Sequence, residues 1–188
     1  MEIFDIVDEH GVPTGATVER VTAHAEGIRH RTAHVWVVRS APEGPQVLLQ
    51  KRADQKDSFP GCYDTSSAGH IPAGQEPLVS ALRELEEELG ITARAEDLTF
   101  IGCFTIQYEK IFYGKPFRDH EISFVYAYTK PVDTASLRLQ AEEVSAVRWF
   151  GVQELAALLS PRDPRICVPE GGFELIRAWC EAQGILTF

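Results

Sequence analysis

Three glutamates, Glu84, Glu87 and Glu88, are spaced so that their carboxylates lie about one turn apart on a single helix. Like charges at this spacing destabilise a helix unless an opposite charge compensates them. Mg²⁺ and Mn²⁺ are hard cations that prefer oxygen ligands, so either ion would supply that compensation. Such an ion can also neutralise a diphosphate and acidify a coordinated water for attack on phosphorus. The spacing alone is equally typical of a solvated acidic helix face, so the surrounding residues must decide between the two.

A helix from about Leu78 to Leu89 is expected to carry the three glutamates. Pro77 suits the first turn of a helix, and Gly90 suits the position at which a helix stops. Helical periodicity predicts one buried stripe formed by Leu78, Leu82, Leu85 and Leu89. The glutamates fall together on the far side, where Arg83 can pair with Glu87 one turn on and orient it.

The residues around this helix form a longer pattern. From Gly69 to Ile91 the chain reads GHIPAGQEPLVSALRELEEELGI, which resembles the Nudix box, G-x5-E-x7-R-E-U-x-E-E-x-G-U with U aliphatic. The positions in register are Gly69, Arg83, Glu84, Leu85, Glu87, Glu88, Gly90 and Ile91. Gln75 departs from the box, because it replaces the first Glu, and Glu76 follows it. In the family that Glu is not the main metal ligand, so the resemblance implies tuned activity, with an inactive or altered enzyme as the alternative.

Resemblance to the Nudix family implies a hydrolase that cleaves diphosphate bonds in a small molecule. It implies that Arg83 and the three glutamates are catalytic and that the glutamates bind Mg²⁺ or Mn²⁺. Gly69 and Gly74 lack a Cβ, so the loop before the helix can approach the site closely. Substrate identity is not readable: the candidates are nucleoside di- or triphosphates, sugar nucleotides, dinucleotides and prenyl diphosphates. Nudix proteins are often dimers, so a homodimer is one expectation.

A second resemblance links the chain to the Nudix-fold branch that includes type I isopentenyl diphosphate isomerase. The segments IRHRTAHVWVV, VLLQKRADQKDSFPGCYDTSSAGH and DHEISFVYAY carry it, so it covers most of the chain. Matching them implies a second metal site, with Asp119 replacing a Glu, formed by His24, His30, His70, Asp119 and Glu121. His24 lies one residue too close to His30 for the family spacing. Imidazole suits Mn²⁺ or Zn²⁺.

The same segments suggest how a substrate would be held. Arg52 and Lys56 match the basic residues that bind diphosphate in the isomerase. Aromatic residues around Phe104 to Phe117 are expected in the core, with a pocket wall that stacks a base as the alternative. Three histidines have no counterpart in the match and are expected to be ordinary: His10, His34 and His120.

Ala68 favours hydrolysis over isomerisation. The isomerase needs a Cys two residues before the His of its GH or SHP motif, and Ala68 occupies that position. Isomerases also tend to lose the RE and EE residues of the box, which this chain keeps. The nearby Cys62 belongs to an FPGC loop and is out of the catalytic register. Isomerase-like activity therefore stays an alternative, as does a Nudix-fold binding module that has lost its chemistry.

The predicted elements are strands, then the helix, then strands and further helices. The predicted strands are Ile3 to Val7, a second strand beginning at Val12, a hairpin of Thr32 to Val38 with Val47 to Gln50, Leu98 to Gln107, Ile122 to Tyr128 and Val144 to Phe150. Two later helices are expected at Val152 to Leu159 and Phe173 to Ala182. This order predicts an α+β fold, an α/β/α sandwich in which helices flank a mixed β-sheet, as in the Nudix fold. One domain spanning residues 1–188 is expected from the length.

Composition narrows the classes of partner. The formal charge of −10 repels a phosphate backbone, and no stripe rich in Lys and Arg appears, so nucleic-acid binding is not expected. The apolar runs are too short to span a membrane. Acidic residues near the N-terminus are unlike a secretory signal, which predicts a cytoplasmic protein. The four cysteines form no CxxC pair and are expected to be reduced.

Overall fold

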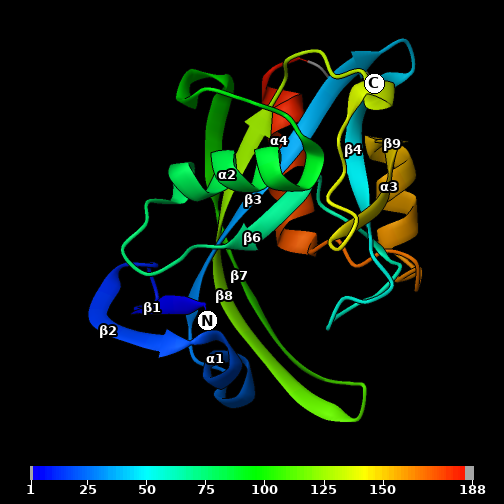
Figure 1. Cartoon of the computed structure of the whole chain (residues 1–188). Coiled ribbons are helices and arrows are strands. Elements are labelled where there is room, and N and C mark those ends of the chain that lie inside the picture. Colours follow the sequence, from blue (N-terminus) through cyan, green and yellow to red (C-terminus); the bar gives the residue numbers. More distant parts are fainter. Residues whose placement is uncertain (1, 185–188) are drawn as a thin grey trace.

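The computed structural model describes residues 2–184, with helices on both faces of a mixed sheet (Figure 1). The strands are β1 (Ile3–Val7), β2 (Pro13–Glu19), β3 (His30–Ala41), β4 (Gly44–Arg52), β5 (Tyr63–Asp64), β6 (Ser67–His70), β7 (Leu98–Phe112), β8 (Lys115–Tyr128) and β9 (Val144–Gly151). The helices are α1 (Arg20–Glu26), α2 (Pro77–Leu89), α3 (Val152–Leu159) and α4 (Glu170–Ala182), with 3-10 turns at Ala95–Asp97 and Thr134–Ser136. The predicted α/β/α sandwich is therefore confirmed.

Strand β3 lies at the centre of the seven-stranded sheet, whose main path runs β5-β4-β3-β8-β7. It pairs in parallel with β8 along its first half and beyond. Its first half also pairs with β6, whereas its second half pairs with β4. Because β4 and β6 part from each other beside the middle of β3, space opens there for a cavity. β9 pairs with β4, and β1 and β2 form a separate two-stranded sheet.

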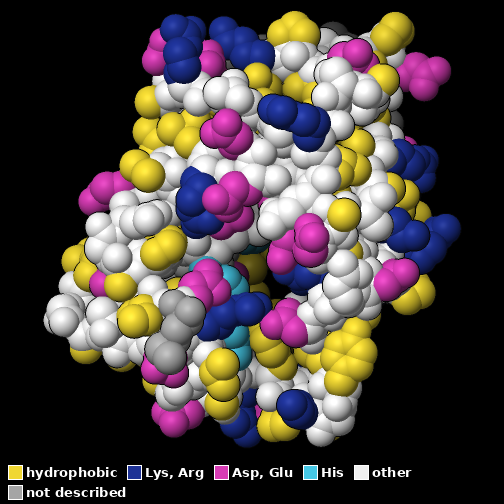
Figure 2. All heavy atoms as spheres, viewed as in Figure 1, with side chains coloured by type: hydrophobic (Ala, Val, Ile, Leu, Met, Phe, Trp, Pro, Cys, Tyr) yellow, Lys and Arg dark blue, Asp and Glu magenta, His cyan; other side chains and the backbone are white. Residues whose placement is uncertain are grey.

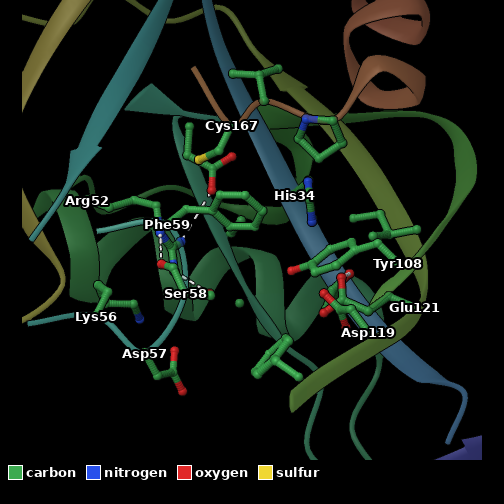
Figure 3. Close-up of a pocket in the computed structure, with 18 of the residues that line it drawn as sticks. His34, Arg52, Lys56, Asp57, Ser58, Phe59, Tyr108, Asp119, Glu121 and Cys167 are labelled. Carbon is green, nitrogen blue, oxygen red and sulfur yellow. Dashed lines mark hydrogen bonds and ion pairs between the residues drawn. The ribbon is translucent and has the colours of Figure 1, made fainter. Parts of the chain in front are cut away.

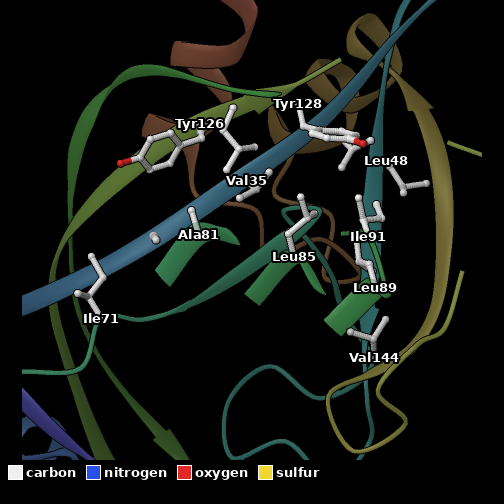
Figure 4. Close-up of a cluster of buried hydrophobic side chains, with 13 residues drawn as sticks. Val35, Leu48, Ile71, Ala81, Leu85, Leu89, Ile91, Tyr126, Tyr128 and Val144 are labelled. Carbon is white, nitrogen blue, oxygen red and sulfur yellow. The ribbon is translucent and has the colours of Figure 1, made fainter. Parts of the chain in front are cut away.

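Alternation along β3 supplies one side chain to each layer in turn. Val35 and Val37 pack on α2, in a cluster with Leu85 and Leu89 (Figure 4). Trp36 faces the other way, into a cluster with α3 and α4. Leu85 and Leu89 are fully buried, and the other two predicted stripe leucines, Leu78 and Leu82, are partly buried. The prediction that these four leucines form the buried stripe of α2 is therefore confirmed.

The two strands predicted from the sequence at the β7–β8 hairpin were too short. These strands extend together to a turn at Tyr113 and Gly114 and project past the sheet (Figure 1). Both turn residues have positive φ, 50° and 75°, as tight hairpin turns require. The charged residues Glu109 and Lys110 obscured the strand in the sequence. Helix α1 and strand β6 were also missed, since α1 is short and β6 is made of small residues.

None of the helices within residues 2–184 is both long and apolar enough to cross a membrane.

Candidate active site

A cavity of about 800 Å³ opens where β4 and β6 diverge. Its wall includes residues from β3, β6, α2 and the β7–β8 hairpin, together with the loop after β4 and the loop before α4. Figure 2 shows the hollow from outside, with acidic, basic and histidine side chains gathered around it. Most residues predicted to do chemistry therefore lie around one space.

Glu84 and Glu88, called here the helix carboxylates, line this cavity. The Glu88 Oε2 atom accepts hydrogen bonds from Gln50 Nε2 at 3.2 Å and from the backbone nitrogen of Ala68 at 3.1 Å. The Glu84 carboxylate lies against Gly69, where an added Cβ would approach its Cδ to 2.1 Å. A side chain at position 69 would therefore displace the Glu84 carboxylate, so Gly69 lets Glu84 lie close to β6, as the sequence suggested.

Burial strongly perturbs the helix carboxylates. It raises the pKa of Glu84 to about 7, although Arg83 opposes the shift. Burial and repulsion from Glu84 raise the pKa of Glu88 to about 8. Two carboxyls that resist ionisation side by side are a chemical fit for a divalent cation, which would stabilise both anions. Glu88 is only 4% exposed because Gln50 and β6 cover it, so the three glutamates do not share one solvent-exposed helix face.

Arg83 links Glu84 to Glu87. Its Nη2 atom lies 2.8 Å from Glu84 Oε1 and donates to the backbone oxygen of His70 at 3.3 Å. Its Nη1 atom lies 3.0 Å from Glu87 Oε2, which is the predicted pairing one turn on. The Glu87 side chain is 52% exposed and does not contribute to the cavity wall formed by the described residues. Glu87 is thus the outermost of the three.

Five further residues meet beside the helix carboxylates, and we call them the histidine cluster: His24, His30, His70, Asp119 and Glu121. They come from four different elements, α1, β3, β6 and β8. The Nε2 atoms of His24 and His70 are 3.2 Å apart. Glu121 Oε1 lies 3.7 Å from His30 Nε2 and 3.6 Å from His70 Nε2, and His24 Nδ1 lies 3.6 Å from Asp119 Oδ1. The resemblance to the isomerase branch thus selected residues that do come together, His24 included.

The histidine cluster fits a bound metal ion by its donor atoms. Within residues 2–184, three buried atoms of the cluster have no hydrogen-bond partner: His24 Nδ1, His30 Nε2 and Asp119 Oδ1. Separations near 3.6 Å are too long for hydrogen bonds but suit ligands that share one ion at about 2 Å. Burial lowers the pKa of His24 to about 4 and that of His70 well below its ordinary value. Both imidazoles are therefore neutral, as metal ligands must be.

Phe4 holds two of these imidazoles in place. Its ring stacks on His30 with a centroid separation of 4.8 Å and on His70 at 4.5 Å. Phe4 is fully buried and packs with Val18 and Ala23 of the N-terminal segment. The β1–β2 sheet and α1 therefore form part of the site.

Arg52 and Lys56 also line the cavity (Figure 3). Arg52 is held by Asp64, 3.2 Å from its Nη1 atom, and donates to the Ser58 backbone oxygen at 3.0 Å and to its Oγ atom at 3.2 Å. Lys56 pairs with Glu143. Ser58 and Asp64 thus position Arg52, and Glu143 positions Lys56. No sequence pattern indicated the supporting role of Asp64.

Aromatic side chains form the far wall of the cavity. Tyr108, Phe112 and Phe117 line it from the β7–β8 hairpin. Phe59 faces them from the loop after β4, with ring centroids 5.7 Å from Tyr108 and 5.0 Å from Phe112 (Figure 3). The expectation that these strand aromatics belong to the core was therefore wrong, because the hairpin extends past the helices that would cover it. Phe59 was missed, since it follows no strand pattern.

Comparison with known proteins identifies the family. A profile described as NUDIX domain matches residues 29–168. The chain belongs to the Nudix family. Enzymes of this family generally use divalent metal ions, which agrees with the donor atoms around the cavity. The predicted family and the class of diphosphate-bond hydrolase agree with this membership.

Similar sequences come from both branches that the motifs suggested. Nudix hydrolase 3 of Arabidopsis thaliana is 40% identical over 97% of this chain, which spans 24% of that protein's length. An uncharacterized Nudix hydrolase of Clostridium acetobutylicum is 37% identical, over 84% of this chain and 74% of that protein. An isopentenyl-diphosphate Delta-isomerase of Dinoroseobacter shibae is 31% identical, over 79% of this chain and 78% of that protein.

Solved structures confirm the fold. DR0079 of Deinococcus radiodurans superposes with a TM-score of 0.68 at 16% identity, over 94% of this chain and 98% of that one. A MutT protein of Methanosarcina mazei superposes with a TM-score of 0.60 at 14% identity, over 82% and 95% of the two chains.

Proposed function

We propose that this chain is a metal-dependent pyrophosphohydrolase that cleaves a diphosphate linkage in a nucleotide-type small molecule. The observation that carries the proposal is the pair of helix carboxylates, partly buried Glu84 and buried Glu88, at the wall of a cavity that also holds Arg52 and Lys56. Acidic groups for a cation and basic groups for phosphate then face the same space. The family supports the hydrolase class, and the whole chain, 1–188, is proposed to act as one domain.

Each residue has a proposed role. Glu84, Glu87 and Glu88 hold Mg²⁺ or Mn²⁺, which when bound supplies charge neutralisation and an acidified water. Arg83 is a positioning residue, because it bridges Glu84 and Glu87 and ties them to the end of β6. Arg52 and Lys56 bind the diphosphate. Arg52 keeps its guanidinium oriented through Asp64 and Ser58, which limits the entropy lost on binding.

We propose that the histidine cluster is a second metal site, for Mn²⁺ or Zn²⁺. The support is its three buried polar atoms without hydrogen-bond partners and its mixture of imidazole nitrogens and carboxyl oxygens. Four residues of the cluster line the same cavity: His24, His70, Asp119 and Glu121. An ion held there would therefore contact the same substrate.

Isomerisation is the second candidate function, favoured by the histidine cluster and by the isomerase relative. It requires an acid and a base on opposite faces of an alkene. Ala68 lines the cavity at the position of the family's catalytic thiol and can supply neither. Hydrolysis needs no group there, so it remains the proposal. A binding module without chemistry is the remaining alternative.

The test is a substrate panel with Mg²⁺ and with Mn²⁺. Nucleoside di- and triphosphates, sugar nucleotides, dinucleotides and isopentenyl diphosphate are incubated with the protein, and products are resolved by chromatography and mass. Metal-dependent cleavage of at least one nucleotide-type diphosphate is expected, without formation of dimethylallyl diphosphate. Isomer formation at an enzymatic rate would overturn the hydrolase assignment, and no turnover of any diphosphate would leave the binding module.

The setting of the enzyme is also proposed. We propose that it acts on a free small molecule in the cytoplasm, away from membranes, and the charge of −10 supports the absence of nucleic-acid binding. A homodimer is proposed because Nudix proteins are often dimers. Size-exclusion chromatography with light scattering, which gives the molar mass in solution, tests it.

A further inference from the structure

His34 is a polar side chain in the cavity that none of the proposed roles uses. It lies at the middle of β3, with Ala68 opposite on β6 and Val125 opposite on β8. Alternation along β3 places it on the same face as Thr32 and Trp36. It therefore lies between Thr32, near the histidine cluster, and Trp36, in the apolar core that packs on α4. His34 is 5% exposed, and its ring points into the cavity (Figure 3).

The His34 Nδ1 atom is fully buried, whereas Nε2 is not, and neither ring nitrogen has a hydrogen-bond partner within residues 2–184. Its strand neighbours Ala68 and Val125 offer no side-chain donor or acceptor, and Phe104 meets it edge-on at a centroid distance of 5.6 Å. Burial lowers the pKa of His34, so the imidazole is neutral and presents one donor and one acceptor. Leaving such a group unpaired in an apolar setting costs free energy that a ligand can recover.

The cavity is chemically divided around this residue. Arg52, Lys56 and the helix carboxylates make one side strongly charged and suited to phosphates and cations. Phe59 and Tyr108 place aromatic rings near His34, and Asp119 and Glu121 lie on the other side of Tyr108 (Figure 3). A diphosphate held on the charged side would direct its organic part toward the aromatic rings and His34. A plain hydrocarbon would leave Nε2 unpaired there, whereas a hydroxyl, carbonyl or amide group would satisfy it.

We propose that His34 is a specificity-determining residue that hydrogen-bonds a polar group on the organic moiety, so that the site selects nucleoside-type diphosphates over hydrocarbon diphosphates. This inference rests on the proposed function and narrows its substrate class. The aromatic wall supplies stacking for a base or a sugar face, and the imidazole supplies the polar contact. A site that hydrogen-bonds its ligand rejects analogues without that group, because its own buried polar atom is then left unpaired.

The test uses two ligands that resist cleavage, α,β-methylene-ADP and methylenebisphosphonate, which share a bridged diphosphate analogue but differ in the organic part. Affinities are measured by calorimetry with Mg²⁺ for the wild type and for His34→Leu, which removes both ring nitrogens. The Kd for α,β-methylene-ADP should rise about 10-fold or more, as expected for one lost hydrogen bond to a buried group. The Kd for methylenebisphosphonate should change less than about twofold.

Two further variants guard against a purely structural effect. His34→Gln keeps a donor and an acceptor and should retain most of the affinity for α,β-methylene-ADP, whereas His10→Leu alters an exposed histidine outside the cavity and should change nothing. Equal losses for both ligands, no loss for either, or equal wild-type affinities for the two ligands would overturn the role of His34. Because neither ligand is cleaved, the result stands apart from the turnover panel. A failed panel would remove the hydrolase function and leave the binding result intact.

Discussion

The helix carboxylates and the histidine cluster face the same cavity, yet they balance charge in different ways. Glu84 and Glu88 are two like charges with raised pKa values, and Arg83 compensates only Glu84 directly. The histidine cluster places imidazole nitrogens 3.6 to 3.7 Å from two carboxyl groups, and burial and the neighbouring Glu121 raise the pKa of one of these, Asp119, to about 9. The first region needs a cation before both of its carboxyls ionise near neutral pH. The second already has neutral nitrogen donors.

This difference predicts different ions and different affinities. All-oxygen ligands suit Mg²⁺, which keeps several waters and exchanges readily. Imidazole ligands suit Mn²⁺ or Zn²⁺ and bind them more tightly. We therefore expect a tightly held ion in the histidine cluster and an exchangeable ion, delivered with the substrate, at the helix carboxylates.

The largest expected effect is on catalysis. Glu88→Gln should lower kcat by about 1,000-fold or more at saturating Mg²⁺, because it removes a metal-ligand charge inside the cavity. Glu87→Gln, at the outermost glutamate, should cause a smaller loss, so the pair forms a matched comparison. Circular dichroism checks that both variants fold. A loss below about tenfold for Glu88→Gln would refute its role as a ligand.

The next effect separates the two regions by metal binding. His70→Ala should weaken binding of Mn²⁺ at the tight site by about 100-fold or more, because it removes a ligand shared with Glu121. Glu88→Gln should leave that tight site unchanged. Titration calorimetry with Mn²⁺ measures both. If the two variants lose the same binding event, the cavity holds one joint site and the comparison fails.

A smaller effect concerns the stability of the metal-free protein as a function of pH. The folded-state pKa of Glu88, about 8, is above the ordinary value of 4.5, so the folded protein retains a proton that the unfolded chain releases. The free energy of unfolding should therefore fall as pH rises from about 4.5 to 8, by roughly 4 kcal/mol for this group. Urea unfolding at each pH measures it.

Glu88→Gln is the control for this stability effect, because its amide does not titrate. The variant should be more stable than the wild type at pH 8 and should lose the part of the slope that Glu88 contributes. Saturating Mg²⁺ should flatten the wild-type slope as well. Parallel slopes in the two proteins would mean that Glu88 ionises freely.

The two regions also differ in how far they could be predicted. The helix carboxylates lie within one contiguous pattern, so periodicity and the box placed α2, Arg83 and the three glutamates together. The burial of Glu88 was not predictable, because the helix pattern does not show that Gln50 and β6 cover its polar side. The histidine cluster joins four elements far apart in the chain, and only the family resemblance selected its members. Neither the periodicity nor the family resemblance selected His34 or Phe59.

The smallest expected effect is at the position where this chain departs from the Nudix box. Gln75 does not line the active-site cavity; its Oε1 atom accepts a hydrogen bond from Ser80 Oγ at 3.2 Å, beside the first turn of α2. Gln75→Glu adds a negative charge near a helix N-terminus, which should stabilise the fold by about 0.3 to 1 kcal/mol. We expect kcat to change by no more than about twofold, because the helix carboxylates stay in place. Steady-state kinetics on the best panel substrate, with thermal unfolding alongside, measure both quantities. A rise in turnover of 100-fold or more would show that Gln75 weakens catalysis directly, and it would revive the binding module as the description of the natural chain.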